Sequence, residues 1–168
     1  MVDRLLFALT LFTALGCGLI GGVFFAFSSF VMNALVRLPA AQGIAAMQSI
    51  NVVVINPLFM TAFLGTAAAC VLLAVSSVLR WREPGAAYLL AGSLLYLVGV
   101  ILVTMLFNVP RNDALAAIAP ASVEGANLWT NYLGSWTAWN HVRTAASLAA
   151  AALLTIAPVL NKLMVFEK

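Results

Sequence analysis

Charged residues are scarce in this chain. Only 8% of the residues are Asp, Glu, Lys or Arg, whereas soluble domains carry about 25%. This is too little charge to coat a globule in water, and 64% of the residues are hydrophobic. The eight basic residues are scattered rather than gathered into a stripe, which argues against nucleic acid as a partner. The composition therefore predicts that this protein lies in a lipid bilayer.

Residues that bind metals or form disulfides are also scarce. The chain has one His and two Cys, and both Cys17 and Cys70 lie within apolar runs. This set provides no zinc or copper site and no disulfide framework. The Walker, Rossmann and Ser-His-Asp signatures are absent from the sequence. We therefore expect no zinc or copper site and no nucleotide-binding motif, although a metal or haem bound through His141 alone stays open.

The chain is rich in long apolar segments. There are four of them, at residues 5–32, 57–79, 86–107 and 137–160. Each can cross the bilayer, which takes about 20 helical residues. Backbone polar groups in lipid must be satisfied within the segment, and β-type alternation is absent, so we expect helices. The sequence predicts an all-α fold, with residues 1–168 forming a single membrane domain, an integral membrane four-helix bundle. In its first segment, Gly18 and Gly22 predict close helix packing.

The two longer connections, residues 33–56 and 108–136, are predicted to be partly helical. In the first, Ile44 and Met47 belong to a set of residues that recur at helical spacing. In the second, Ser122 is typical of a helix start, and this helix is expected to continue into the last apolar segment.

Basic residues predict the orientation of the bundle. Five of them lie near the termini or in the tight turn 80–85, namely Arg4, Arg80, Arg82, Lys162 and Lys168. The longer connections contain only Arg37 and Arg111. Because cytoplasmic loops carry the excess of Lys and Arg, both termini should be cytoplasmic and the longer connections extracytoplasmic. We expect a multi-pass protein of the cell (inner) membrane.

The last apolar segment carries a polar arc on one helical face. On a helical wheel with about 100° per residue, the arc is centred on Asn140 and also contains Trp136, Arg143, Thr144 and Ser147. His141 stands at the edge of the arc, about 100° from Asn140. The opposite face runs through alanines at positions 138, 145 and 149. Such a helix should turn its arc towards protein or a water-filled cavity.

Arg143 is the most informative member of the arc because it lies inside the apolar segment. A cation facing lipid at that depth costs at least about 2.5–3.5 kcal/mol, so such residues usually face the bundle interior and mark function. The alternative is an arginine whose head group snorkels to the lipid head groups. For His141, the alternative to a functional role is a hydrogen-bonded structural residue.

Four asparagines are expected at the same end of the bundle as the arc: Asn51, Asn56, Asn108 and Asn112. Each is a candidate for binding a ligand. Asn56 precedes Pro57 and could instead cap the helix that follows. Asn108 and Asn112 flank Pro110, so turn or cap roles are the alternative for both.

Several of these residues lie in motifs that resemble the anthrone oxygenase family. The motifs are Gly21–Phe27, Ile50-Asn51, Ile55-Asn56-Pro57-Leu58-Phe59, Asn108-Val109-Pro110-Arg111-Asn112-Asp113-Ala114-Leu115 and Trp136-Thr137-Ala138-Trp139-Asn140-His141-Val142-Arg143-Thr144. The resemblance extends from about Gly21 to Leu154. It implies a small four-span membrane enzyme that converts an anthrone to an anthraquinone with O2 and holds no cofactor tightly.

The residue types of the arc suit this chemistry. His141 could act as the base that deprotonates a phenolic substrate, and Arg143 could stabilise the enolate and peroxide charge. Asn108 and Asn140 could orient the phenol oxygens, and Trp136 could stack on a flat aromatic ring. The predicted partner is therefore a small hydrophobic aromatic substrate, oxidised without a cofactor.

Two other classes of function fit the same polar arc. A non-enzymatic protein could bind or transport a small molecule, such as a quinone or a lipid, without turning it over. A structural subunit could pair Arg143 with another chain, and homo-oligomers stay open for the same reason.

Overall fold

The computed structural model describes the backbone of residues 2–166 and the side chains of residues 4–161, and every regular element in that range is helical. In chain order, the elements are α1 (Val2–Ala26), η1 (Phe27–Val31), α2 (Met32–Val36), α3 (Ala40–Val53), α4 (Pro57–Leu79), α5 (Ala86–Tyr96), η2 (Leu97–Leu102), η3 (Thr104–Asn108), α6 (Val109–Ala116) and α7 (Val123–Phe166). The predicted all-α fold is confirmed.

Successive elements join into four helices that are long and apolar enough to cross a membrane. They run over Arg4–Val36, Pro57–Leu79, Ala86–Ala116 and Val123–Asn161. The protein is therefore an all-α membrane bundle. The predicted segment 57–79 coincides with α4, whereas the other three helices continue past the predicted segments. How much of each helix lies within the bilayer stays a prediction.

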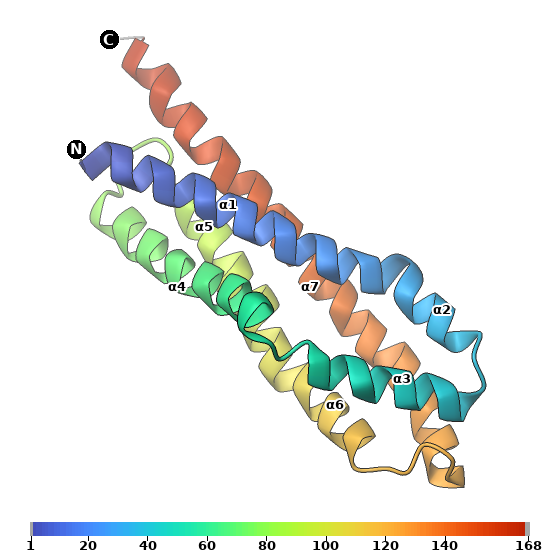
Figure 1. The fold of residues 1–168 in the computed structure, drawn as a ribbon. Helices are drawn as coiled ribbons and strands as arrows, with labels where there is room; N and C mark the ends of the chain where they lie inside the picture. Colours follow the sequence, from blue (N-terminus) through green and yellow to red (C-terminus); the bar gives the residue numbers. More distant parts are fainter. Residues whose placement is uncertain (1, 167–168) are drawn as a thin grey trace.

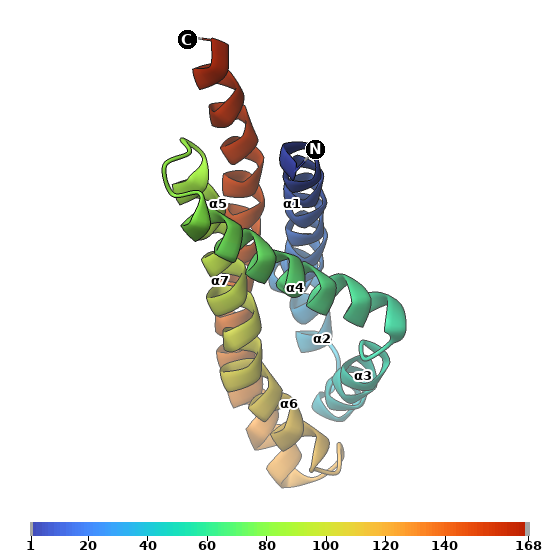
Figure 2. The same cartoon turned by 90° about the vertical axis from the view of Figure 1, so that its left-hand side faces the viewer.

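The molecule is elongated, and α7 runs along its whole length (Figures 1 and 2). In what we call the terminal half, α1 and α5 pack against the C-terminal part of α7, and α4 packs against α1 and α5. In the distal half, α2, α3 and α6 surround the N-terminal part of α7. The two longer connections are thus partly helical, because they contain α2, α3, α6 and the first turns of α7.

Each half has its own hydrophobic core. The core of the terminal half includes Phe63, Tyr96 and Leu154, together with Cys17 and Cys70, which are both buried and free. The core of the distal half includes Ile44, Met47, Leu115, Trp129 and Trp136. Three buried polar residues of α7, Asn140, Arg143 and Thr144, lie in the sequence between its contributions to the two cores.

Three stretches of the long helices are π-helical. They are η1, which follows α1, and η2 and η3, which lie between α5 and α6. A π-helical turn contains one residue more than an α-helical turn and is frequent at functional sites. Each such turn changes which side chains face α7.

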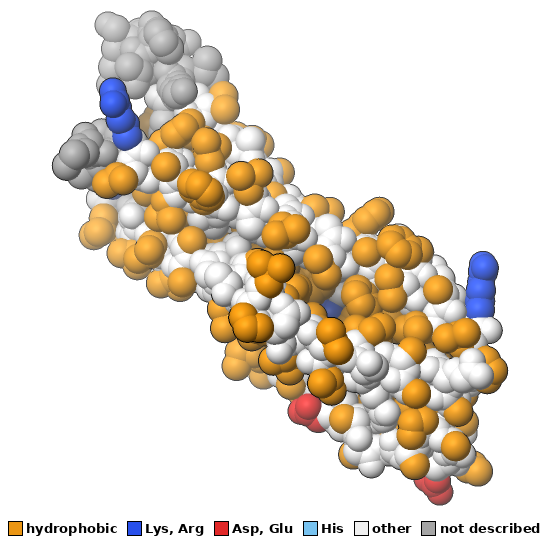
Figure 3. All heavy atoms as spheres, in the orientation of Figure 1, with side chains coloured by type: hydrophobic (Ala, Val, Ile, Leu, Met, Phe, Trp, Pro, Cys, Tyr) orange, Lys and Arg blue, Asp and Glu red, His pale blue; other side chains and the backbone are white. Residues whose placement is uncertain are grey.

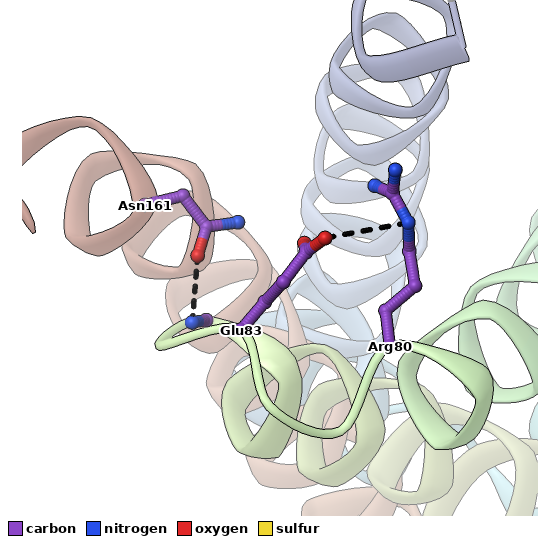
Figure 4. A network of polar contacts seen from close by, with 4 residues as sticks. Arg80, Glu83 and Asn161 are labelled. Carbon is purple, nitrogen blue, oxygen red and sulfur yellow. Dashed lines mark hydrogen bonds and ion pairs between the residues drawn. The ribbon is translucent and has the colours of Figure 1, made fainter. Parts of the chain in front are cut away.

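Polar contacts hold the tight turn between α4 and α5 in place at the end of the terminal half (Figure 4). The backbone N–H of Gly85 donates to Asn161 Oδ1 at 2.7 Å, and Arg80 Nε lies 3.4 Å from Glu83 Oε1. A Cβ atom at Gly85 would clash with the Ala157 carbonyl oxygen at 2.5 Å, so only glycine allows this close approach. The turn therefore fixes the C-terminal part of α7 against α5.

Candidate functional site

The polar arc of α7 faces the interior of the bundle. Asn140 and Ser147 are fully buried, and Arg143 and Thr144 are also buried, whereas the alanines at positions 138, 145 and 149 are exposed. Continuous α-helical geometry explains this division, because residues three and four apart share a face. The helical wheel therefore predicts the buried face of α7 correctly.

The guanidinium of Arg143 lies between two aromatic rings. Its Cζ atom is 4.2 Å from the centroid of the Phe24 ring and 5.1 Å from that of Trp136. Nη2 donates to Asn140 Oδ1 at 2.7 Å, and Nη1 donates to Thr104 Oγ1 at 3.3 Å. Only 5% of the residue is exposed. The side chain therefore does not reach out to the lipid head groups.

The charge of Arg143 has no counterion among the side chains of residues 4–161. Among the side chains that the structure describes, none makes an ion pair with Arg143, and its Nε atom has no hydrogen-bond partner. Phe24 and Trp136 offer their ring faces to the cation, which is a favourable but weaker interaction than a carboxylate would provide. A buried and uncompensated cation is costly unless something with negative charge joins it.

Asn140 connects Arg143 to the first helix. Its Nδ2 donates to the Phe24 carbonyl oxygen and to Ser28 Oγ, both at 2.7 Å, while its Oδ1 accepts from the guanidinium. Ser28 Oγ also lies 3.2 Å from Thr144 Oγ1. Both polar atoms of the Asn140 amide thus form hydrogen bonds, which fixes the position of Arg143.

Asn108 brings a second unpartnered atom to this region. Its Nδ2 donates to the Trp136 carbonyl oxygen at 3.2 Å, but its buried Oδ1 has no hydrogen-bond partner. Only 1% of Asn108 is exposed. The site therefore presents a free acceptor on Asn108 as well as a free donor on Arg143.

Asn112 holds two aromatic side chains on the distal side of the site. Its Oδ1 accepts from Tyr132 Oη and from Trp136 Nε1, both at 2.8 Å. The side chain of Asn51 lies beside the Tyr132 hydroxyl, and the buried Nδ2 of Asn51 has no hydrogen-bond partner. These contacts fix the Trp136 ring that faces Arg143.

Two predicted site residues lie apart from this cluster. Asn56 caps α4, because its Oδ1 accepts from the Phe59 N–H and its Nδ2 donates to the Val53 carbonyl oxygen, both at 3.0 Å. This is the alternative that the sequence left open, and both polar atoms of the Asn56 amide take part in it. His141 is exposed on the outer side of α7 and makes no hydrogen bond to any described residue. Its role as a base stays a prediction that the geometry does not favour.

Sequence reasoning missed four residues of the site: Phe24, Ser28, Thr104 and Tyr132. Ser28 lies in η1 and Thr104 in η3. An α-helical wheel assigns the wrong face to residues in or beyond a π-helical turn, so periodicity could not place them. Phe24 lies in a motif that carries the family resemblance, and this motif is the signal that could have marked it.

The arrangement can bind a flat molecule that carries oxygen atoms. Arg143 Nε can donate to a carbonyl or enolate oxygen, and Asn108 Oδ1 can accept from a hydroxyl group. The rings of Phe24 and Trp136 provide apolar faces beside the cation. Within the described residues, no group of three or more His, Cys, Asp and Glu could hold a metal ion.

The surface is hollowed over this region. Figure 3 shows a hollow between α1 and the α3–α4 junction, over the middle of α7, with a basic side chain at its bottom. Hydrophobic side chains surround the hollow. The hollow therefore lies over the part of the bundle that contains α7, and it opens on an apolar surface.

Comparison with known families adds an independent finding. The family model described as Anthrone oxygenase matches residues 59–153, which is more than half of the chain. The matched range contains Asn108, Trp136, Asn140 and Arg143. Comparisons with curated proteins and with solved structures found no match.

Proposed function

The chain belongs to the anthrone oxygenase family, and on this basis we propose that it is a membrane-embedded oxygenase without a bound cofactor. Its substrate is a flat phenolic, anthrone-like molecule, and its oxidant is O2. The residues that we assign to the site are Arg143, Asn140, Asn108 and Trp136, with Asn51 and Asn112 in support.

The single observation that carries this proposal is the buried charge of Arg143. A cation in a site of low polarity stabilises negative charge far more than it would in water. Negative charge develops on the substrate oxygen when an anthrone loses a proton. The site therefore suits a reaction whose intermediates are an enolate and a peroxide.

The proposed reaction balances with O2 alone. The ring CH2 group loses a proton, and the resulting enolate passes an electron to O2. A bond then forms between that ring carbon and oxygen, which gives a hydroperoxide. Loss of water from the hydroperoxide leaves a carbonyl group, so CH2 and O2 become C=O and H2O. Arg143 lowers the free energy of the enolate and of the peroxide.

The proton has to leave without a strong base. Among the described residues, no carboxylate and no histidine contacts Arg143. We infer that the cation makes the substrate acidic enough for its proton to pass to water. His141 is the base that the sequence predicts, but its exposed position on α7 leaves it a role only through intervening water.

The remaining polar atoms orient the substrate. Asn108 Oδ1 accepts a hydrogen bond from a substrate hydroxyl, and Arg143 Nε donates one to the oxygen that becomes negative. Trp136 lies against one ring face, held by Asn112. Asn140 and Thr104 hold the guanidinium at two of its nitrogens, which fixes the charge relative to the substrate.

We further propose that the protein spans the cell (inner) membrane four times, with both termini in the cytoplasm. The excess of basic residues near the termini and in the turn 80–85 supports this orientation. The site then lies towards the extracytoplasmic side of the bilayer.

An oxygen electrode tests the proposed function. Purified protein in lipid vesicles is supplied with anthrone, and O2 consumption and quinone formation are followed together. We expect one O2 consumed for each quinone formed, above the rate of vesicles without protein. Binding of anthrone without O2 consumption would instead support a non-enzymatic quinone- or lipid-binding protein.

A further inference from the structure

The α3–α4 junction carries an exposed apolar patch next to the hollow. Four side chains form this junction patch, and each is between 66% and 84% exposed: Val52, Val53, Ile55 and Leu58. No charged residue occurs between Arg37 and Arg80. A loop in water is usually polar, so this composition is typical of a segment that lies in lipid.

The backbone of the junction is suited to an apolar environment. The N–H groups of residues 54, 55 and 56 all donate to carbonyl oxygens within the junction or at the end of α3. The Asn56 side chain donates to one further carbonyl oxygen and accepts from the first turn of α4. Non-helical backbone is tolerated at membrane depth only where its polar groups are satisfied by protein or face water, and this junction satisfies the groups just named.

The length of α4 places the junction at the boundary of the bilayer. The helix has 23 residues, which at about 1.5 Å per residue gives roughly 35 Å. The hydrocarbon core is about 30 Å thick. The two ends of α4, at Leu58 and Leu79, should therefore lie near the two opposite membrane surfaces.

A row of aromatic rings leads from the junction to the buried cation. Phe59, in the first turn of α4, stacks on Phe63 with ring centroids 5.8 Å apart. Phe63 meets Phe24 edge to face at 6.5 Å, and Phe24 lies 4.2 Å from the guanidinium of Arg143. Flat aromatic molecules pack favourably against such rings.

We propose that the substrate reaches Arg143 sideways from the bilayer, through an opening at the junction patch and over the Phe59, Phe63 and Phe24 rings. The ligand is a flat aromatic molecule dissolved in the lipid leaflet. This proposal rests on the proposed function for the identity of the ligand. The hollow between α1 and the α3–α4 junction is the opening (Figure 3).

The two ends of α4 provide a matched pair of variants. Leu58 is 84% exposed and Leu79 is 80% exposed, so Leu58→Lys and Leu79→Lys should leave packing unchanged. Both add one positive charge to the same helix near a membrane surface. Only Leu58→Lys adds it at the proposed opening.

The experiment uses the full chain in vesicles. Anthrone is added under nitrogen, and the rate of binding is followed by quenching of tryptophan fluorescence. O2 consumption is then measured against the mole fraction of anthrone in the lipid. We expect Leu58→Lys to slow binding and to raise KM about tenfold at unchanged kcat, because a charged group there disfavours passage of an apolar ligand. We expect Leu79→Lys to behave as the unchanged protein does.

Three outcomes would overturn the route. Leu58→Lys could leave binding and KM unchanged, both variants could act equally, or Leu58→Lys could lower kcat alone. If the unchanged protein binds anthrone but consumes no O2, the oxygenase proposal fails. The binding rates of the two variants would then still show whether anthrone enters at the junction patch.

Discussion

The two halves of the molecule satisfy their polar side chains in different ways. In the terminal half, most of the bonded hydroxyl groups donate back to their own helix, as Thr10 does to the Leu6 carbonyl oxygen and Thr66 to that of Ala62. The exceptions are Tyr96 and Ser147, which donate to carbonyl oxygens of a neighbouring helix. At the site and in the distal half, amide side chains bond between helices, as those of Asn140 and Gln48 do. Local bonds leave helix positions free, whereas bonds between helices fix them. The proposed site therefore lies where the relative positions of the helices are fixed.

The strongest test of this comparison is removal of the charge with Arg143→Met. We expect O2 consumption to fall by about a hundred- to thousandfold, which is the loss that removal of one such charge-stabilising group causes elsewhere. Unfolding temperature should fall little or rise, because a buried charge is lost together with its desolvation cost. The measurements are O2 uptake and thermal unfolding in detergent.

Arg82→Met is the control, since Arg82 is exposed at the α4–α5 turn. It should leave O2 uptake unchanged. Equal loss in both variants would show that net charge, rather than the buried position of Arg143, determines the rate.

The next largest effect is expected for Asn140→Leu. This change leaves the Phe24 carbonyl, Ser28 and the guanidinium without their shared partner. Leaving a buried group unsatisfied costs about 1–3 kcal/mol, so the free energy of unfolding should fall by roughly 2 kcal/mol or more. O2 uptake should fall with it.

Thr10→Val sharpens the comparison, because it removes a hydroxyl that bonds only within α1. We expect the free energy of unfolding to fall by less than about 1 kcal/mol, which is the usual contribution of one hydrogen bond. O2 uptake should stay normal. A cost as large as that of Asn140→Leu would contradict the difference between the halves.

Substitutions at glycines in the terminal half should change stability less than Asn140→Leu does. A Cβ atom at Gly99 would clash with the Ala146 side chain, whereas one at Gly22 meets nothing within 4 Å. Gly99→Ala should therefore lower the unfolding temperature. Gly22→Ala should instead raise the free energy of unfolding by about 0.5–1 kcal/mol, because alanine has the higher helix propensity. Its unfolding temperature should therefore rise slightly. Destabilisation by both changes would mean that α1 packs against a surface outside this chain.

The smallest effect is expected for His141→Ala. Because His141 is exposed and lacks a hydrogen bond to any described residue, the rate should stay within about twofold of the unchanged protein between about pH 5 and 8. Initial rates of O2 uptake against pH provide the measurement. A hundredfold loss at neutral pH would restore His141 as the base.

Much of the fold follows from the sequence, because hydrophobic segment length and α-helical period are local properties. They identify the four helices, the helical character of the longer connections and the inward face that carries Asn140 and Arg143. The alternative in which Arg143 snorkels to the head groups is wrong, since its guanidinium is enclosed by Phe24 and Trp136.

Other features depend on contacts that the sequence does not contain. Gly18 and Gly22 predict close packing, yet both positions face open space, and close approach occurs instead at Gly16 and Gly99. Spacing within one helix cannot reveal which side meets a neighbour. Likewise, the π-helical stretches η1 and η3 bring Ser28 and Thr104 to the site, and no residue type marks such a turn in advance.

The single helix α7 contributes to both hydrophobic cores over its 44 residues. Neither half can therefore retain its core once α7 has melted, and loss of order in one half should spread to the other. We expect the protein to denature as one cooperative unit, with hydrogen exchange slowest along α7.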